Sequence, residues 1–515
     1  MWKRLNVAEN YLWLFAVPAM FFLLNPAKFC ADDGFFYPQI AHNLVNGLGF
    51  HFNDVYSTNG FHPLWMVVCI ILDFILPFSK QGMIYVLWMV QVVLFFGSLS
   101  KLRPFFRYGT WGEMLAVAFL TLVFFSLGTL YLTEAHLNLF CIALLLNLLT
   151  KIKTVDGWTL GLAASLVFLS RLDNVFVLLF LGLYCLTSSE RPKIKDLLKA
   201  IGVCTLLLGS YLFYNYVEFG NVIPVSGRIK SSFPYAEGSL LGNKWGSLFF
   251  GFNLVYAVML LFCKVDFRKL KLYFVLGALL QLVYNLYFQS QIGQWYFVMQ
   301  MLAVAFMASD IWELLFSKYT KQNFSTLKLI GGLVLVGGLS GVAFLKASTN
   351  LSLGYNIDGS HEAIKVVQAD RIQSLAEDLK KILPPGSRVF TYDMPGKLAI
   401  YSDLEIVPAD GLVADESYFD KIKTLPFEEF LKENKIDYVL LPTRFEKDGT
   451  RTFIGIQAIQ QNGQVSYQMR SSWLKQNVGP ITVSKFDTVK IYPNPLKVWQ
   501  PDYDNVVLLK LKNKE

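Results

Sequence analysis

Apolar segments long enough to cross a bilayer recur through the first two thirds of the chain, and this repetition most constrains its fold. They lie at 11–24, 61–79, 82–100, 111–130, 133–149, 157–187, 200–217, 246–263, 272–290, 295–316 and 327–345. A helix needs about 20 apolar residues to cross the hydrocarbon core, so the segments predict about eleven crossings. Of 515 residues, 54% are hydrophobic and 16% charged, whereas a soluble domain carries about 25% charge. The sequence therefore predicts a polytopic all-α membrane protein.

The net charge of +8 does not indicate nucleic acid as a partner, because Lys and Arg are scattered between apolar segments. The six cysteines all precede residue 264 and form no CxxC pair, which argues against a disulfide framework or a thiolate metal site. No small-x-small cleavage site follows the first apolar run, so we expect it to remain as a signal anchor.

Basic residues between the segments predict the orientation of the chain in an inner (plasma) membrane. If residues 3–4 lie inside, the loop 29–60 lies outside and the clusters 191–199, 264–271 and 318–328 lie inside. The clusters 101–107 and 151–153 would then fall outside. They would fall inside if 61–79 were a partial crossing and 157–187 were two short helices broken at Arg171.

The composition changes to that of a soluble domain from Lys346 onward. Short apolar runs predict strands at Arg388–Tyr392, Leu404–Val407 and Tyr438–Leu441, with a helix at Phe427–Asn434. We therefore expect two parts, a membrane domain of residues 1–346 and a small extracytoplasmic α/β domain of residues 347–515.

Paired carboxylates, Asp32 and Asp33, follow the first apolar run directly. Carboxylates at a membrane boundary lose solvation, so they persist where a cation, a hydrogen-bond network or a reaction needs them. The polar, glycine-bearing loop that follows adds Asn59 and His62 as candidate substrate-binding residues. We expect the two carboxylates to diverge, and we favour Asp33 as a catalytic base because its neighbour Gly34 allows a substrate to approach closely.

Other ionisable residues lie within or beside the apolar segments. Glu134 begins one segment, and Arg171 with Asp173 interrupts another. The Arg171/Asp173 pair is either a self-neutralising pair at a helix break or a fixed cation for an anionic lipid headgroup. Asp310, near the end of a segment, is interpreted as reaching toward the surface.

Two basic residues, Arg228 and Lys230, lie in the serine- and glycine-rich loop 218–245. Such a loop either holds a phosphate through charge and backbone N–H groups or is simply solvated. An acidic site on the same face favours the phosphate interpretation.

Metal and nucleophile motifs are missing from the sequence. The five histidines show no HExxH spacing, and neither a GxSxG motif nor a phosphate-binding glycine loop is found. Because carboxylates and asparagines are hard oxygen ligands, a divalent cation at the Asp32/Asp33 pair remains an alternative.

The acidic stretch ADDGFFYPQIAHNLVNGLGFHFN, followed by TNGFHPLW, resembles the GT-C class of polytopic glycosyltransferases, in particular the bacterial arabinofuranosyltransferase-like and protein-mannosyltransferase-like branch. LTEAHL around Glu134, SRLD at 170–173, FGNVIPVSGRIKSSFP and the segment from VFTYDMPGKLAIYSD to IDYVLLP are similar to further parts of that branch. The resemblance implies transfer of a sugar from a polyprenyl-phosphate donor on the non-cytoplasmic face, usually with inversion. The implied acceptor is an envelope glycan, lipid or protein.

The residues themselves suit that chemistry. Displacing a phosphate at the anomeric carbon needs a base for the acceptor hydroxyl and cations for the departing phosphate. Asp33 or Asp32 would supply the base, and Arg171, Arg228 and Lys230 are candidates for the phosphate. A transporter or lipid flippase is the rival class, but the inverted repeats that it predicts are not seen in the sequence. A non-catalytic envelope scaffold would leave the two aspartates unexplained.

Overall fold

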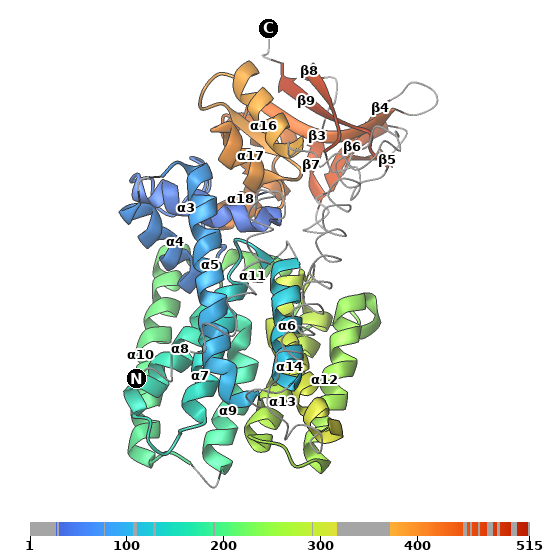
Figure 1. Cartoon of the computed structure of the whole chain (residues 1–515). Coiled ribbons are helices and arrows are strands. Elements are labelled where there is room, and N and C mark those ends of the chain that lie inside the picture. The colour runs from blue at the N-terminus through green and yellow to red at the C-terminus, as the bar shows by residue number, and fades with distance from the viewer. Residues whose placement is uncertain are drawn as a thin grey trace.

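The computed structural model describes the chain in segments. These are residues 27, 30–76, 78–106, 111–126, 130–188, 191–290, 292–316, 371–445, 451–453, 456–461, 464–470, 477–481, 485–495 and 502–512. A helical bundle carries a mixed α/β domain at one end (Figure 1). The expected spans at 11–24 and 327–345, and the expected boundary at 346, lie outside the described residues.

The bundle and the segments next to it consist almost entirely of helices. In chain order they are η4 (Asp32–Phe35), α3 (Phe36–Val45), α4 (Pro63–Ile75), α5 (Lys80–Leu102), η5 (Arg103–Phe105), α6 (Trp111–Ser126), α7 (Ala135–Leu149), α8 (Gly157–Ser170), η7 (Leu172–Asn174), α9 (Val175–Thr187), α10 (Ile194–Phe219), α11 (Val225–Lys230), η8 (Leu240–Gly242), α12 (Lys244–Phe262), α13 (Arg268–Phe288), η9 (Gln294–Phe297) and α14 (Val298–Phe316).

Five stretches of the described chain are long and apolar enough to cross a membrane: Lys80–Phe105, Ile194–Phe219, Lys244–Phe262, Arg268–Phe288 and Gln294–Leu315. Five shorter apolar helices accompany them, at Pro63–Ile75, Gly112–Phe125, Ala135–Leu149, Gly157–Ser170 and Leu172–Thr187. The predicted helical membrane architecture is therefore confirmed. The predicted count of about eleven crossings is not established by the described residues.

Local sequence signals explain where several helices begin and end. Asp156 caps α8 by accepting a hydrogen bond from the Thr159 backbone N–H at 3.0 Å. The same helix stops at Arg171, whose backbone is extended, and α9 resumes after one turn of 3-10 helix. The predicted break at Arg171 is thus confirmed. Helix α10 ends at Gly220, whose φ of 69° is the left-handed conformation that glycine adopts without strain.

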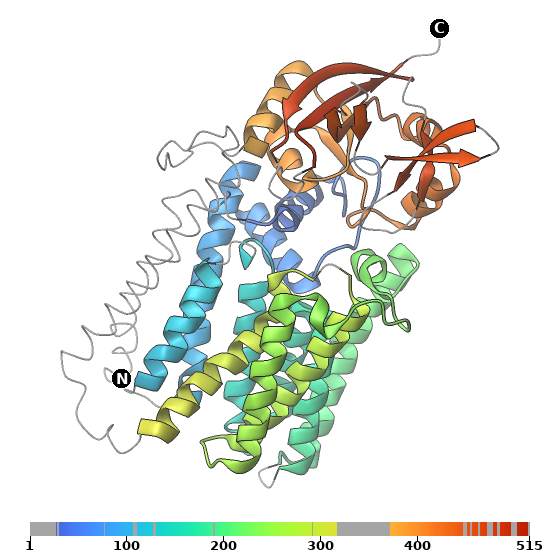
Figure 2. The ribbon, with the colours of Figure 1, turned by 90° about the vertical axis from the view of Figure 1, so that its right-hand side faces the viewer.

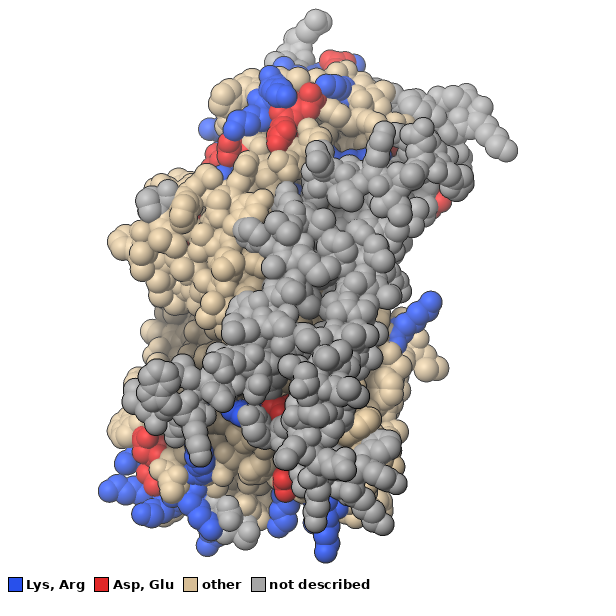
Figure 3. Space-filling model, viewed as in Figure 1, with Lys and Arg blue, Asp and Glu red and all other residues tan. Residues whose placement is uncertain are grey.

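The helix break at Arg171 and the short helix α4 bring the basic clusters to one end of the bundle. The carbonyl of Lys101 accepts a hydrogen bond from the Asn147 side chain near the end of α7. The rings of Phe105 and Phe267 lie 5.2 Å apart, which places the end of η5 beside the α12–α13 turn. Lys and Arg side chains accordingly collect at the end opposite the mixed domain (Figure 3). This arrangement reconciles the clusters at 101–107 and 151–153 with the others.

The mixed domain contains two sheets flanked by helices. In chain order its elements are α16 (Arg371–Ile382), β1 (Arg388–Thr391), α17 (Pro395–Ser402), β2 (Glu405–Pro408), α18 (Glu416–Thr424), α19 (Phe427–Glu433), β3 (Tyr438–Phe445), β4 (Arg451–Phe453), β5 (Ile456–Gln461), β6 (Gln464–Arg470), β7 (Asn477–Ile481), β8 (Phe486–Pro493) and β9 (Asn505–Leu511). The strands and the helix that we predicted between 388 and 441 are confirmed within a few residues.

The larger sheet has the order β2-β1-β3-β9-β8, with β4 beside β3, and a separate sheet has the order β5-β6-β7. Strands β2, β1 and β3 are parallel, and Val389 lies opposite both Ile406 and Tyr438. Their carboxyl ends therefore meet at one edge, which is where α/β sheets hold functional loops. Figure 2 shows both sheets beyond the same end of the bundle.

The loop 30–62 joins the bundle to this domain. The Asp54 carboxylate accepts a hydrogen bond from the Arg388 guanidinium at 2.6 Å, and the Asn53 amide donates to the carbonyl of Ile406 at 3.0 Å. Helix α3 contacts α17, while α4 packs on α8 of the bundle. The loop thus lies against both parts.

We expect the first loop and the mixed domain to lie on the same, non-cytoplasmic side. In a background with the six cysteines replaced by alanine, single cysteines at the exposed positions Asn46 and Lys381 should react with a membrane-impermeant maleimide in intact cells. A cysteine at exposed Lys195, at the basic end, should react only after permeabilisation. Labelling of Asn46 and Lys195 from the same side would contradict this topology.

Candidate functional site

The two neighbouring aspartates point to different parts of the molecule. The Asp32 carboxylate accepts hydrogen bonds from the backbone N–H groups of Gly396 and Lys397, at 2.8 and 2.9 Å, at the start of α17. The Asp33 carboxylate instead faces Lys230, with 3.5 Å between its Oδ2 and the ammonium nitrogen. Asp32 therefore attaches the mixed domain, and Asp33 faces the bundle.

Burial raises the pKa of Asp32 to about 7, although its two backbone hydrogen bonds act in the opposite direction. Burial lowers the pKa of Lys230, but the Tyr296 phenol and the Asp33 carboxylate outweigh this and raise it above its ordinary value. Lys230 is thus held in its charged form beside Asp33. Their separation exceeds that of a direct charge-assisted hydrogen bond, about 2.7–2.9 Å.

A second ionic cluster is centred on Arg171, whose side chain is almost completely buried in the bundle. Its Nε and Nη2 donate to the two oxygens of Asp173 at 3.0 and 3.1 Å, and its Nη1 donates to Glu134. The Asn285 amide donates to Asp173 at 3.0 Å. The guanidinium charge is therefore matched by two carboxylates.

Glu134 also joins this cluster to the first loop. The Tyr37 hydroxyl donates to its Oε2 at 3.1 Å, and His62 Nε2 lies 3.5 Å from its Oε1. Burial lowers the pKa of His62, which favours the neutral imidazole at neutral pH. The predicted residues His62, Glu134, Arg171 and Asp173 are thus brought together.

Tyr296 connects the two clusters. The Arg171 guanidinium lies over its ring, 4.1 Å from the centroid, and the same phenol contributes to the raised pKa of Lys230. Tyr296 therefore packs on the Arg171 cluster and acts electrostatically on Lys230, the partner of Asp33. Sequence analysis missed Tyr296, for which the only signal was its place in the short aromatic run QWYF at the start of the apolar segment 295–316.

The mixed domain contributes Asp410, in the loop after β2. Its Oδ1 accepts a hydrogen bond from the Leu412 backbone N–H at 2.9 Å, and burial raises its pKa to about 7. Asp33 and Lys230 both act electrostatically on it, with opposite signs. The carboxyl-end edge of the parallel strands therefore faces the Asp33/Lys230 pair.

Two predicted substrate-binding residues have other partners. Arg228 forms an ion pair with Glu416 of the mixed domain. The Asn59 side chain accepts from the Val225 backbone N–H at 2.9 Å and donates to Asn215 at 3.4 Å. In this conformation both residues hold the outer loops together, and a role for either in binding substrate stays a prediction.

The reason that we gave for Gly34 needs correction. A Cβ at this position would lie 2.9 Å from the Cβ of Leu132 and 2.9 Å from the Tyr131 carbonyl oxygen. Glycine is required there because η4 packs closely on the chain before α7, and substrate access is not the cause. Asp310 is also corrected, because it is buried and paired with Lys271 at 2.7 Å rather than directed toward the surface.

The alternative of a divalent cation gains no structural support. Among the described residues, no group of three or more His, Cys, Asp or Glu side chains is arranged to hold a metal ion. Asp32, one of the expected ligands, is engaged by α17.

A polar pocket of about 280 Å³ begins beside Lys230. The backbone N–H of Ser290 donates to the Lys230 carbonyl at 2.8 Å, and Ser290 is part of the pocket wall. Hydroxyl, amide and carboxylate groups line it, from Ser232, Glu237, Ser239, Asn243, Gln289 and Ser290. Such groups match the hydroxyls of a sugar.

The fold to be compared with known structures is a helical membrane bundle with an acidic first loop and a mixed α/β domain over one end. Among solved structures, apo ArnT from Cupriavidus metallidurans is similar, with a TM-score of 0.52, 13% identity, and coverage of 88% of this chain and 97% of ArnT. No family model and no curated protein matches the sequence. The GT-C resemblance is therefore confirmed for the fold.

Asp32 and Asp33 should differ in their effect on stability. Asp32→Ala leaves two backbone N–H groups of α17 without their acceptor, a loss of about 1–3 kcal/mol in the free energy of unfolding. Asp33→Ala removes one long, partly exposed ion pair and should cost less than about 1 kcal/mol. Thermal unfolding of the purified protein in detergent measures both. Equal losses would contradict the assignment of Asp32 to domain attachment.

Asp410 should make stability depend on pH. Because its pKa rises from 3.8 to about 7 on folding, its contribution is present at low pH and is lost as the pH rises through 7. Asp410→Asn cannot ionise, so its stability relative to the wild type should increase by roughly 1–3 kcal/mol between pH 5 and pH 8. Unfolding midpoints at the two pH values test this. A difference that does not change with pH would contradict it.

Proposed function

We propose that this protein is a glycosyltransferase that moves a sugar from a polyprenyl-phosphate donor to an envelope acceptor on the non-cytoplasmic face of the membrane, with inversion. The contact between Asp33 and Lys230 carries the proposal. A carboxylate and an ammonium lie side by side where the first loop, the bundle and the mixed domain meet, which supports an acid–base role for the pair. The GT-C fold supports the same class of reaction.

The reaction needs one bond to form and one to break. The Asp33 carboxylate takes the proton of an acceptor hydroxyl as the acceptor oxygen bonds to the anomeric carbon. The bond from that carbon to the phosphate oxygen breaks, and the polyprenyl phosphate leaves with the electron pair. The Lys230 ammonium stabilises the negative charge that develops on this phosphate. Entry of the phosphate separates Lys230 from Asp33 and frees the base.

Arg171 has a positioning role in this scheme. Its charge is already matched by Asp173 and Glu134, so it offers less to a phosphate than Lys230 does. Its guanidinium packs on the Tyr296 ring. A direct contact of Arg171 with the phosphate, which the sequence suggested, stays a prediction.

The polar pocket next to Lys230 is the proposed place for the sugar. Ser290 of the pocket wall bonds to the backbone of Lys230, and the hydroxyls of a bound ring would meet the serine, asparagine and glutamine side chains. Exposed Phe233, Tyr235 and Leu241 on the same loop suit contact with the membrane interface. A lipid-linked sugar could therefore enter from the bilayer.

The transporter or flippase alternative is not favoured. A transporter site lies at the midplane between two related halves, whereas the Asp33/Lys230 pair lies at the end of the bundle that the mixed domain covers. The GT-C fold also argues against that class.

Asp33→Asn should reduce turnover by about 10²- to 10⁴-fold while donor binding is retained, because only the base is lost. Lys230→Met should weaken donor binding by roughly ten- to a hundredfold through loss of one charge-assisted contact. Arg228→Met removes a cation two residues away that pairs with Glu416, and it should weaken donor binding less than Lys230→Met does. Sugar transfer from a panel of polyprenyl-phosphate sugars gives the readout. Full activity of Asp33→Asn would refute the proposed base.

A further inference from the structure

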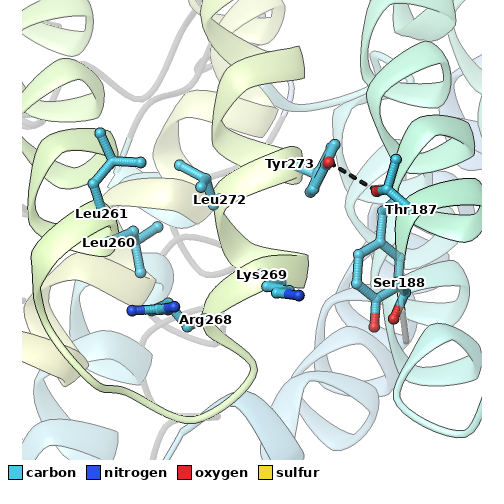
Figure 4. A pocket seen from close by; sticks show the side chains of 9 residues that line it. Thr187, Ser188, Leu260, Leu261, Arg268, Lys269, Leu272 and Tyr273 are labelled. Atoms are coloured by element: carbon cyan, nitrogen blue, oxygen red, sulfur yellow. Dashed lines mark hydrogen bonds between the residues drawn. The ribbon is translucent and has the colours of Figure 1, made fainter. Parts of the chain in front are cut away.

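A second pocket, of about 240 Å³, opens at the basic end of the bundle, far from Asp33 (Figure 4). It lies between the C-terminal end of α9 and the first turns of α13, with the last residues of α12 forming its apolar side. The proposed reaction uses none of its residues. Three kinds of group line it, namely cations, hydroxyls and leucines.

The cations are Arg268 and Lys269, which begin α13. Among the described residues no carboxylate lies within ion-pair distance of either, whereas Lys271 on the same helix pairs with Asp310 at 2.7 Å. The first turn of α13 contains no acidic residue. Within the described part of the chain, no carboxylate pairs with the positive charge at this pocket, which favours an anionic occupant.

The hydroxyl groups stand across the pocket from Arg268 (Figure 4). The Thr187 hydroxyl donates to the Leu183 carbonyl at 2.8 Å, so in its 2.8 Å contact with Tyr273 the tyrosine hydroxyl is the donor. The Tyr273 oxygen keeps its lone pairs as acceptors. A headgroup such as phosphoglycerol matches both sides of the pocket. Its phosphate suits the cations, and its hydroxyl can donate a hydrogen bond to the Tyr273 oxygen.

Leucines form the apolar side of the pocket, from buried Leu260 to exposed Leu261. Leu261 is 57% exposed, and the neighbouring surface of α9 exposes Leu186 to the same degree. Phe262, the last residue of α12, is 80% exposed. Apolar side chains left open on a membrane bundle contact acyl chains.

We infer that this pocket binds an anionic phospholipid, with Arg268 and Lys269 on its phosphate, Tyr273 on its polar headgroup and Leu261 beside its acyl chains. Basic pockets between membrane helices at the cytoplasmic end select such lipids. The inference is independent of the proposed sugar transfer. The occupant is inferred from the three kinds of group that line the pocket, which are cations, hydroxyls and leucines.

The full chain, reconstituted in phosphatidylcholine nanodiscs with a few per cent phosphatidylglycerol or cardiolipin, tests the inference by native mass spectrometry of retained lipid. The Arg268→Gln, Lys269→Gln double variant should retain roughly thirtyfold less anionic lipid, which corresponds to two contacts of about 1 kcal/mol each. Lys193→Gln, Lys195→Gln is the matched control, because both lysines are exposed at the same end but lie outside the pocket.

Unchanged retention in the pocket variant, or an equal loss in the control, would overturn the inference. Displacement of the lipid by millimolar inorganic phosphate would also overturn it, because a site for free phosphate does not need the leucines. Thermal unfolding of both variants in lipid-free detergent checks that the fold is intact. The single variant Leu261→Ser, which keeps both cations, should weaken retention of long-chain but not of short-chain phosphatidylglycerol.

Discussion

A guanidinium buried inside a helical bundle must be surrounded by carboxylates, and much of the candidate site depends on meeting this need at Arg171. Removing one partner would leave an unpaired charge, at a cost of about 3–5 kcal/mol. Asp173 in η7 and Glu134 at the start of α7 supply these carboxylates. The extended backbone at Arg171 breaks the long apolar segment there. The ring of Tyr296 covers the remaining face. The neutralised cluster thereby becomes a rigid support for its neighbours.

The Asp33/Lys230 pair lies where three parts of the chain meet, and each part is fixed independently. Asp32 fastens the first loop to α17, the pair Asp54/Arg388 fastens it to β1, and α11 lies against α18 through Arg228. Arg228 and Lys230, both in α11, thus have different partners: Arg228 pairs with the mixed domain and Lys230 pairs with Asp33. A loop without regular structure can present a base precisely when its neighbours are held in this way.

The sequence predicted those features that depend on local pattern. The helix break at Arg171, the divergence of Asp32 and Asp33, and the strands near residues 388 and 438 all follow from short-range spacing. Tyr296 and Asp410 were not predicted, because their roles depend on contacts between segments far apart in the chain. The partner of Arg228 was missed for the same reason, since Glu416 lies in a different domain. The span count stays a prediction, because helices such as α4 are too short to be classified by length and two of the expected spans lie outside the described residues.

The attachment of Asp32 to α17 joins residues 364 positions apart in the chain. During synthesis the first loop emerges long before the residues that receive its carboxylate, and a close approach of Gly60 to the Leu412 carbonyl likewise waits for the last third of the chain. The contacts that hold the first loop can therefore all form only after residues 396–416 have been synthesised. A shorter polypeptide would contain the two aspartates without the partners that separate them, so the placement of the first loop depends on the chain's last third.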